Sequence, residues 1–125
     1  MTNAQTDGKK MWAICLDMET GKKIHEILVF ENEKPQFCHS MNSYATPTPV
    51  IDDGRVLVHF GTHGTAALDA VTGKKLWARR DLKCNHHRGA AASPIPFEKS
   101  FVLHFDGFDV QYVVALEQAT GKTLW

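Results

Sequence analysis

Short apolar runs alternate with polar turn residues along the whole chain, and no run shows the sustained period of an amphipathic helix. The runs are rich in β-branched and aromatic residues, as in RVLVHF at 55–60 and SFVLHF at 100–105. Gly, Asp and Ser interrupt them at intervals of roughly 8–12 positions. This pattern predicts an all-β protein of short antiparallel strands.

One stretch of eleven residues occurs three times: ALDAVTGKKLW at 67–77, ALEQATGKTLW at 115–125 and, in weaker form, CLDMETGKKIH at 15–25. The three Thr-Gly pairs are 52 and 48 residues apart. Four antiparallel strands in a repeat of this length are typical of a propeller blade. A β-sandwich is the alternative, but sandwiches do not normally repeat their sequence in this way.

Each complete repeat is expected to hold four strands, A to D. We predict them at 46–51, 55–60, 65–70 and 74–79, then at 93–97, 100–105, 112–117 and 122–125, with strands C and D alone at 11–17 and 22–30. The corresponding units are a half blade at 11–31, a full blade at 43–82 and a nearly full blade at 90–125. Since propellers close with about four to eight blades, we expect part of a longer chain.

The repeated stretch encodes a turn followed by a docking side chain. Asp69 and Thr72 can accept backbone N–H groups in the turn, and Gly73 accepts the left-handed conformation without steric cost. Trp77 then projects from the next strand, where small Ala67 leaves room for its ring. We expect this ring to pack against the neighbouring blade.

The pattern A-x-D-x-x-T-G-x-x-x-W resembles the tryptophan-docking motif of pyrroloquinoline-quinone (PQQ) repeat propellers. That family includes quinoprotein alcohol dehydrogenases and non-catalytic members such as the outer-membrane assembly lipoprotein. The matching positions are Ala67, Asp69, Thr72, Gly73 and Trp77, and in the last copy Ala115, Glu117, Thr120, Gly121 and Trp125. The first copy departs from the pattern with Cys15 for Ala and His25 for Trp, and we expect His25 to fill the space of the missing ring. The resemblance implies seven or eight blades and an extracytoplasmic bacterial protein.

Charge and composition exclude some partners. Lys and Arg total 14, as do Asp and Glu, so the net charge is zero. A neutral chain lacks the basic surface that nucleic acids or anionic membranes require. No apolar run approaches the ~18 residues of a spanning helix, and MTNAQTDGKKM at 1–11 lacks the apolar core of a signal peptide. We expect neither a nucleic-acid partner nor a membrane span, and the compartment rests on the resemblance alone.

The B–C and D–A connections of an up-and-down blade fall on one face, and here they carry the chemically distinctive residues. We expect a site for a small molecule, peptide or protein there. The candidate binding residues are His39, Asn42, His63, His86, His87, Arg88, Asp106 and Asp109. Zinc or copper is a weaker hypothesis, whose candidate ligands are His39, His63, His86, His87, Cys38 and Cys84. No two of these share an established ligand spacing, so they are expected to be loop residues bonded to backbone or water.

His59 and His104 occupy the same place in strand B of two repeats, and we expect both to be structural. For catalysis, the resemblance implies an adjacent Cys-Cys pair, a calcium site of Glu, Asn and Asp, and an Asp base. The chain has no Cys-Cys pair, and no Glu and Asn companions for Asp106 and Asp109 match the family pattern. We therefore expect no catalytic residue and no cofactor within these residues.

The favoured hypothesis is a non-catalytic propeller segment that binds a ligand or protein, with the remaining blades as its partners. The alternative is a PQQ-dependent oxidoreductase, with PQQ and calcium, whose catalytic residues lie outside residues 1–125. A third hypothesis is a structural piece without separable activity.

Overall fold

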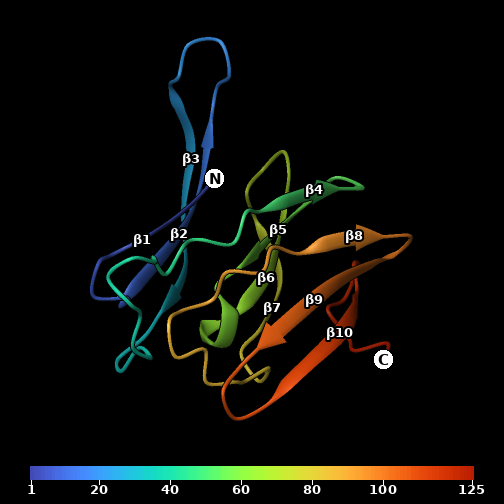
Figure 1. The fold of residues 1–125 in the computed structure, drawn as a ribbon. Coiled ribbons are helices and arrows are strands. Elements are labelled where there is room, and N and C mark those ends of the chain that lie inside the picture. The colour runs from blue at the N-terminus through green and yellow to red at the C-terminus, as the bar shows by residue number, and fades with distance from the viewer.

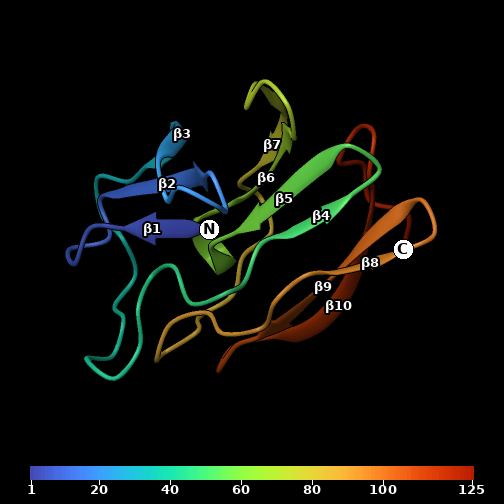
Figure 2. The same ribbon diagram turned by 90° about the horizontal axis from the view of Figure 1, so that it is seen from above.

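The computed structural model describes residues 1–125 as three antiparallel sheets that follow one another along the chain (Figure 1). They are β1–β2–β3, β4–β5–β6–β7 and β8–β9–β10. The strands are β1 Thr2–Ala4, β2 Lys10–Leu16, β3 Lys23–Glu31, β4 Val50–Asp52, β5 Arg55–His59, β6 Thr65–Asp69, β7 Lys75–Arg79, β8 Ile95–Phe97, β9 Ser100–Asp106 and β10 Gln111–Glu117. Seen from above, the sheets stand one beside the next (Figure 2). The prediction of an all-β partial propeller is confirmed.

Strands β4 and β8, each the first of its sheet, are shorter than predicted. β4 spans Val50–Asp52, whereas the strand was expected at 46–51. It begins late because Pro47 and Pro49 have no N–H to donate to a neighbouring strand. β8 begins only after Pro94, and its own Pro96 is tolerated because β8 lies at the edge of its sheet.

Two strands differ from expectation. β1 pairs with β2, Thr2 opposite Ala13 and Ala4 opposite Met11, so the first sheet has three strands where two were predicted. At the other end, the strand expected at 122–125 is reduced to a single bridge between Leu116 and Thr123. Its hydrogen bonding continues along the chain, since the Leu124 N–H donates to the Ala115 carbonyl at 2.8 Å.

The turn between β6 and β7 is closed by side chains of the repeated stretch. Asp69 Oδ1 accepts the Thr72 N–H at 2.7 Å and the Thr72 hydroxyl at 2.8 Å. These bonds favour the carboxylate, and the Thr72 N–H in particular lowers the pKa of Asp69. Gly73 follows at φ 71°, in the left-handed region. Asp17, Thr20 and Gly21 repeat this arrangement between β2 and β3.

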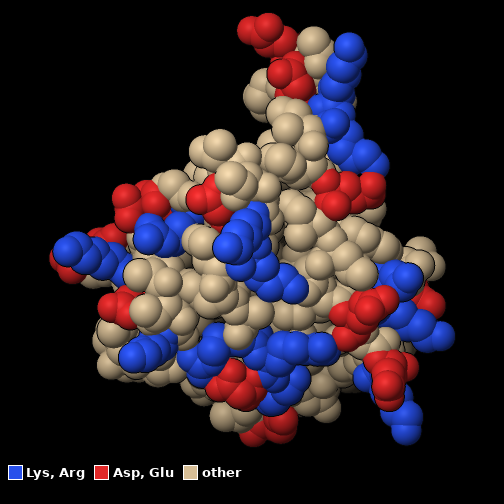
Figure 3. All heavy atoms as spheres, turned by 180° about the vertical axis from the view of Figure 1, so that it is seen from behind, with Lys and Arg blue, Asp and Glu red and all other residues tan.

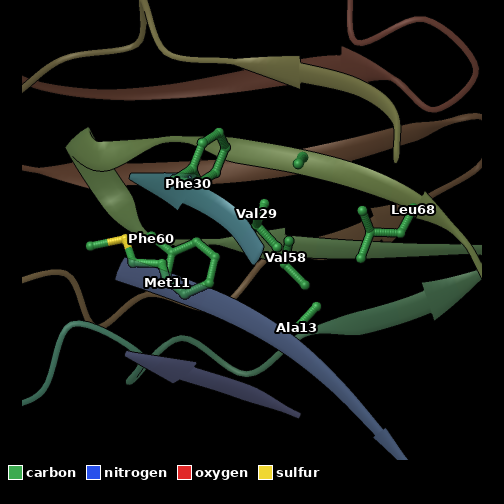
Figure 4. Close-up of a cluster of buried hydrophobic side chains, with 8 residues drawn as sticks. Met11, Ala13, Val29, Phe30, Val58, Phe60 and Leu68 are labelled. Carbon is green, nitrogen blue, oxygen red and sulfur yellow. The ribbon is translucent and has the colours of Figure 1, made fainter. Parts of the chain in front are cut away.

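Apolar side chains fill the space between successive sheets. Between the first and second sheets, the ring of Phe30 meets that of Phe60 edge to face, with centroids 6.0 Å apart. The cluster comprises Met11, Ala13, Val29, Phe30, Val58, Phe60, Ala66 and Leu68 (Figure 4). A second cluster joins the second and third sheets through Leu57, Ala67, Cys84, Phe101, Leu103, Phe105, Val114 and Leu116. Each sheet is therefore stabilised by burial against its neighbour.

Trp77 links the second sheet to the third. Its Nε1–H donates to the Gln118 carbonyl at 2.8 Å. The ring lies over Gly121, where an added Cβ would come within 2.6 Å of it. Arg79, on the same strand, donates to the Gly121 carbonyl at 2.6 Å. The equivalent Trp125 is 65% exposed, so its docking role stays a prediction.

The far face of the third sheet is open to solvent. Ile95, Phe97 and Val113 are 63%, 60% and 49% exposed, because the strand register puts all three on the side opposite to the core residues of β9. A sheet face of this kind is a surface for another layer. No helix in the structure is long and apolar enough to cross a membrane.

Candidate binding face

The loop face consists of the connections 32–49 and 80–94 together with the turns 60–64 and 107–110, and it occupies the lower side of Figure 1. Hydrogen bonds tie these four segments together. Residue 39 bonds to residue 88, residue 62 to residue 83, and residue 85 to residue 108. The four segments therefore form one continuous surface.

Gln36 is the main link between the two long connections, and sequence reasoning did not select it. Its N–H donates to His63 Nε2 at 3.0 Å. Its side-chain Nε2 donates to the Cys84 carbonyl at 3.3 Å, and its Oε1 accepts the His86 N–H at 2.8 Å. A single glutamine with no repeat equivalent carries no signal in the sequence that would have identified this role.

His63 is held in one neutral form. Its Nε2 accepts the Gln36 N–H, so its Nδ1 carries the proton and donates to the Phe60 carbonyl at 3.1 Å. The Tyr44 ring meets it edge to face at 5.4 Å. Burial lowers the pKa of His63, because the charged form would lose solvation. Both ring nitrogens are occupied, which leaves none for a ligand.

The half-buried His86 and the buried Cys84 form a pair beside the short 3₁₀ turn η1, Gly61–His63. The Thr62 N–H donates to His86 Nε2 at 3.1 Å. Cys84 Sγ lies 3.3 Å from the same nitrogen. Burial raises the pKa of the Cys84 thiol to about 11, aided by the charges of Asp109 and Asp106. Cys84 is therefore a protonated, inert thiol near neutral pH.

The backbone carbonyl of Arg88 accepts hydrogen bonds from the first long connection, residues 32–49. It accepts the His39 N–H at 3.3 Å and the Asn42 Nδ2–H at 2.9 Å. Gly89 follows at φ 96°, and an added Cβ there would lie 2.7 Å from Cys38 Sγ. Asn42 and the Arg88 backbone thus have a structural task, whereas the Arg88 side chain is free.

Asp109 organises the turn between β9 and β10. Its Oδ1 accepts the N–H groups of Asn85 at 2.7 Å and of Val110 at 2.8 Å. The Asn85 bond is the main reason that the pKa of Asp109 is lowered. His87, at φ 56°, packs its ring against that of Phe108, with centroids 4.5 Å apart and the planes tilted by 49°.

The candidate metal ligands do not converge. No group of three or more His, Cys, Asp or Glu side chains has a geometry that could hold a metal ion. His63 and His86 are bonded to backbone groups, and His39 accepts the Met41 N–H at 3.1 Å.

A cavity of about 310 Å³ lies on this face, where the connection 86–92 passes the end of β9. Its walls are His59, His86, Arg88, Gly89, Ala90, Ala91, Ala92, His104, Asp106, Gly107 and Phe108. It therefore brings together three of the predicted binding residues, His86, Arg88 and Asp106, and leaves out the other five. A larger hollow of about 710 Å³ between Glu31 and Lys83 has no apolar wall residue, and small-molecule sites are mostly apolar, so the smaller cavity is the better candidate.

The two strand histidines differ in this cavity. His59 is 1% exposed, and its Nδ1 lies 2.7 Å from the Thr65 hydroxyl. Burial lowers the pKa of His59 to about 3. His104, at the same place in the next repeat, is exposed, and its side chain makes no hydrogen bond. The structural role expected of both histidines is found for His59.

On one face of the molecule, charged side chains of both signs are mixed. On the side opposite to Figure 1, Lys and Arg alternate with Asp and Glu, and neither sign covers the face (Figure 3). This face therefore carries no extended patch of one sign, in agreement with the zero net charge.

The sequence profile described as outer membrane protein assembly factor BamB matches residues 4–125 of the chain. No curated protein matches it.

Several solved structures share the fold. Quinohemoprotein alcohol dehydrogenase from Comamonas testosteroni superposes with a TM-score of 0.67 at 20% identity, over 94% of this chain and 19% of its own. Quinohemoprotein alcohol dehydrogenase ADHIIG from Pseudomonas putida HK5 gives 0.67 at 22% identity, over 94% and 19%. BamB from Moraxella catarrhalis gives 0.57 at 16% identity, over 99% and 34%. The chain thus spans between 19% and 34% of the length of these proteins, and the likeness concerns the fold.

Proposed function

Because the chain belongs to the family of PQQ-like propellers described as outer membrane protein assembly factor BamB, we propose that residues 1–125 are part of a non-catalytic propeller that binds a partner or ligand through its loop face. The remaining blades would cover the open faces of the first and third sheets. The family description supports a location in a bacterial cell envelope.

One observation carries this proposal: the wall of the cavity of about 310 Å³ includes three polar side chains that are not used to hold the fold together. The side chains of Arg88, His104 and Asp106 make no hydrogen bond within the chain, and Phe108 is 76% exposed. A rigid rim of this kind, with unused donors and acceptors beside an aromatic ring, suits recognition. The other loop residues hold the rim in position.

The residues present do not fit PQQ. Cys15, Cys38 and Cys84 are three separate free cysteines, and no adjacent pair exists. Asp109, one of the two carboxylates considered for calcium, already binds two backbone N–H groups through its Oδ1. We therefore derive no oxidation step for these residues, and the quinoprotein alternative requires blades beyond them.

Site-specific cross-linking tests the loop face. The photoreactive residue p-benzoylphenylalanine, introduced at position 108 of the full-length protein, should give a discrete adduct in intact cells. The charge reversal Arg88→Glu should reduce its yield at least several-fold. The same probe at position 98, in the turn between β8 and β9 on the opposite face, is the matched control and should give no adduct. Equal adducts at both positions would contradict the proposal.

A second assay separates the enzyme alternative. Full-length protein incubated with PQQ and calcium should neither acquire the absorbance of bound cofactor nor reduce an artificial dye with a primary alcohol. Stoichiometric cofactor binding with alcohol oxidation would replace the proposed scaffold role by the quinoprotein one.

A further inference from the structure

The hollow of about 710 Å³ on the loop face has only polar and charged side chains in its wall. It lies where the connection that leaves β3 passes the turn η1 and the segment after β7. The charged residues of the wall are Lys34, Arg80 and Lys83 together with Glu31 and Glu33. The first and second sheets and their own connections supply the whole wall.

Arg80 is held in this wall by uncharged groups. Its Nη1 donates to the Glu31 carbonyl at 3.0 Å, and its Nη2 donates to Asn32 Oδ1. The central carbon of its guanidinium lies 5.4 Å from the centroid of the Phe30 ring. A carbonyl, an amide and an aromatic face fix the position of the guanidinium but leave its charge uncancelled.

Lys83 is anchored in the same manner. Its Nζ donates to the Thr62 carbonyl at 2.8 Å. Burial and, after it, the charge of Arg80 lower the pKa of Lys83, so the two cations lie close enough to repel each other. Asp81, whose charge acts in the opposite direction, is engaged by Arg79. Neither Arg80 nor Lys83 belongs to an ion pair of the chain.

The two carboxylates of the wall do not balance these cations. Glu31 Oε1 lies 3.6 Å from Lys10 Nζ, so Glu31 already has a cation of its own outside the hollow. Glu33 is followed in the chain by Lys34, and neither of them forms an ion pair. An excess of positive charge therefore stays with the anchored Arg80 and Lys83.

This arrangement suits carboxylates better than other ligands. Cations that are already oriented lose little freedom on binding, and a guanidinium can bind a carboxylate through two parallel hydrogen bonds. The lack of apolar wall residues argues against a typical small-molecule site. The size of the hollow, and the presence of cations on two separate chain segments, favour several carboxylates in a row over one compact anion.

Building on the function proposed for the loop face, we propose that this hollow receives an acidic segment of a partner protein, whose carboxylates pair with Arg80 and Lys83. The exposed Lys34 adds to the attraction. Complementary charge of this kind selects the partner and speeds association, and salt screens it.

The test is fluorescence anisotropy of the full-length protein with fluorescein-labelled hexaglutamate. The peptide should bind saturably, more weakly as salt is added, and the hexaglutamine peptide should not bind. Arg80→Gln combined with Lys83→Gln should weaken binding by about ten-fold or more. Lys99→Gln removes an exposed lysine in the turn between β8 and β9, and as the matched control it should leave binding unchanged.

A second pair of variants checks that the charges themselves are recognised. Arg80→Glu combined with Lys83→Glu should abolish binding of hexaglutamate and create binding of hexalysine. Lys34→Gln should weaken hexaglutamate binding several-fold. Because the Lys34 side chain makes no hydrogen bond within the chain, this variant keeps the test informative even if the Arg80 variants fold poorly.

Three outcomes would overturn the proposal. Hexaglutamate could fail to bind, or it could bind equally well to the folded double Gln variant and to Lys99→Gln protein. Alternatively, vesicles of phosphatidylglycerol could bind through Arg80 and Lys83 while the peptide does not, which would assign the hollow to a lipid surface. The adduct at position 108 separates this proposal from the one on which it rests: an adduct without peptide binding overturns the acidic partner alone, and peptide binding without an adduct contradicts only the role proposed for the cavity beside Phe108.

Discussion

His59 and His104 show how one residue at one place in two repeats acquires different properties. The His59 ring is enclosed by the third sheet and meets Phe105 edge to face at 5.2 Å. His104 faces solvent on the open side of that sheet. The difference lies entirely in whether a following sheet covers the residue.

The buried His59 should make stability depend on pH. Its folded-state pKa is about 3, below the ordinary value of 6.5, so between these values only the unfolded state binds the proton. Stability is complete above pH 6.5 and falls as the pH drops toward 3, by ~1.4 kcal/mol per pH unit at most. His59→Gln should flatten the fall in melting temperature between pH 7 and 4. His63 and His86, whose pKa values are lowered too, would retain part of the slope.

His104→Gln is the matched control for this measurement and should leave the slope of the wild-type protein unchanged. If His59→Gln and His104→Gln gave the same slope as the unmodified protein, burial of His59 would not be the source of the acid sensitivity.

Gln36 should be the most sensitive polar residue of the loop face. Gln36→Ala removes its contacts with the Cys84 carbonyl and the His86 N–H, which leaves two partly buried backbone groups without partners. We expect a loss of about 1–3 kcal/mol in the free energy of unfolding and faster hydrogen exchange over residues 83–90. Gln5→Ala, at an exposed position, should change neither. Unaltered exchange would mean that the other loop contacts suffice.

At the scale of the element, the turn after strand C appears three times in different surroundings. Gly21, Gly73 and Gly121 have φ values of 68°, 71° and 72°, so their backbone geometry is the same. Gly21 has nothing within 4 Å of an added Cβ, whereas at Gly121 that atom would lie 2.6 Å from the Trp77 ring. Two glycines with one conformation thus differ only in what lies beside them.

This pair separates backbone strain from contact between sheets. Gly21→Ala should cost ~1–2 kcal/mol for a left-handed residue with a side chain. Gly121→Ala should cost that amount and about 1–3 kcal/mol more, because the Trp77 ring must move. Chemical denaturation of both variants measures the difference. Equal losses would show that Trp77 does not hold the two sheets together.

Much of the fold follows from the sequence at this scale, and the omissions have physical reasons. The period of the repeats predicts the three sheets and their strand order. β1 is missed because Thr2–Ala4 is short and carries no apolar alternation; its pairing with β2 alone makes it a strand. The predicted loop residues do lie on one face. Their division into structural and free side chains depends on which backbone groups lie nearby, as Gln36 illustrates, and local sequence does not encode that.

At the scale of the whole molecule, the exposed side of the third sheet is the dominant feature. Isolated residues 1–125 should self-associate as concentration rises, because exposed apolar sheet faces seek a partner. Val113→Lys should shift sedimentation of the isolated segment toward the monomer. In the full-length protein the same substitution should instead destabilise the fold, since the next blade would bury the lysine. Val71→Lys, at a position 82% exposed on a turn, should have little effect in either.

The strand order described above also bears on how the protein reaches its native state. Every strand pairs with a strand adjacent in the chain, and the Trp77 contact with Gln118 spans 41 positions. Pairing between strands that are adjacent in the chain costs little loop-closure entropy. In arrays of this kind each unit interacts mainly with its nearest neighbours. Each sheet can therefore form soon after its residues leave the ribosome, and the next sheet can then pack against it.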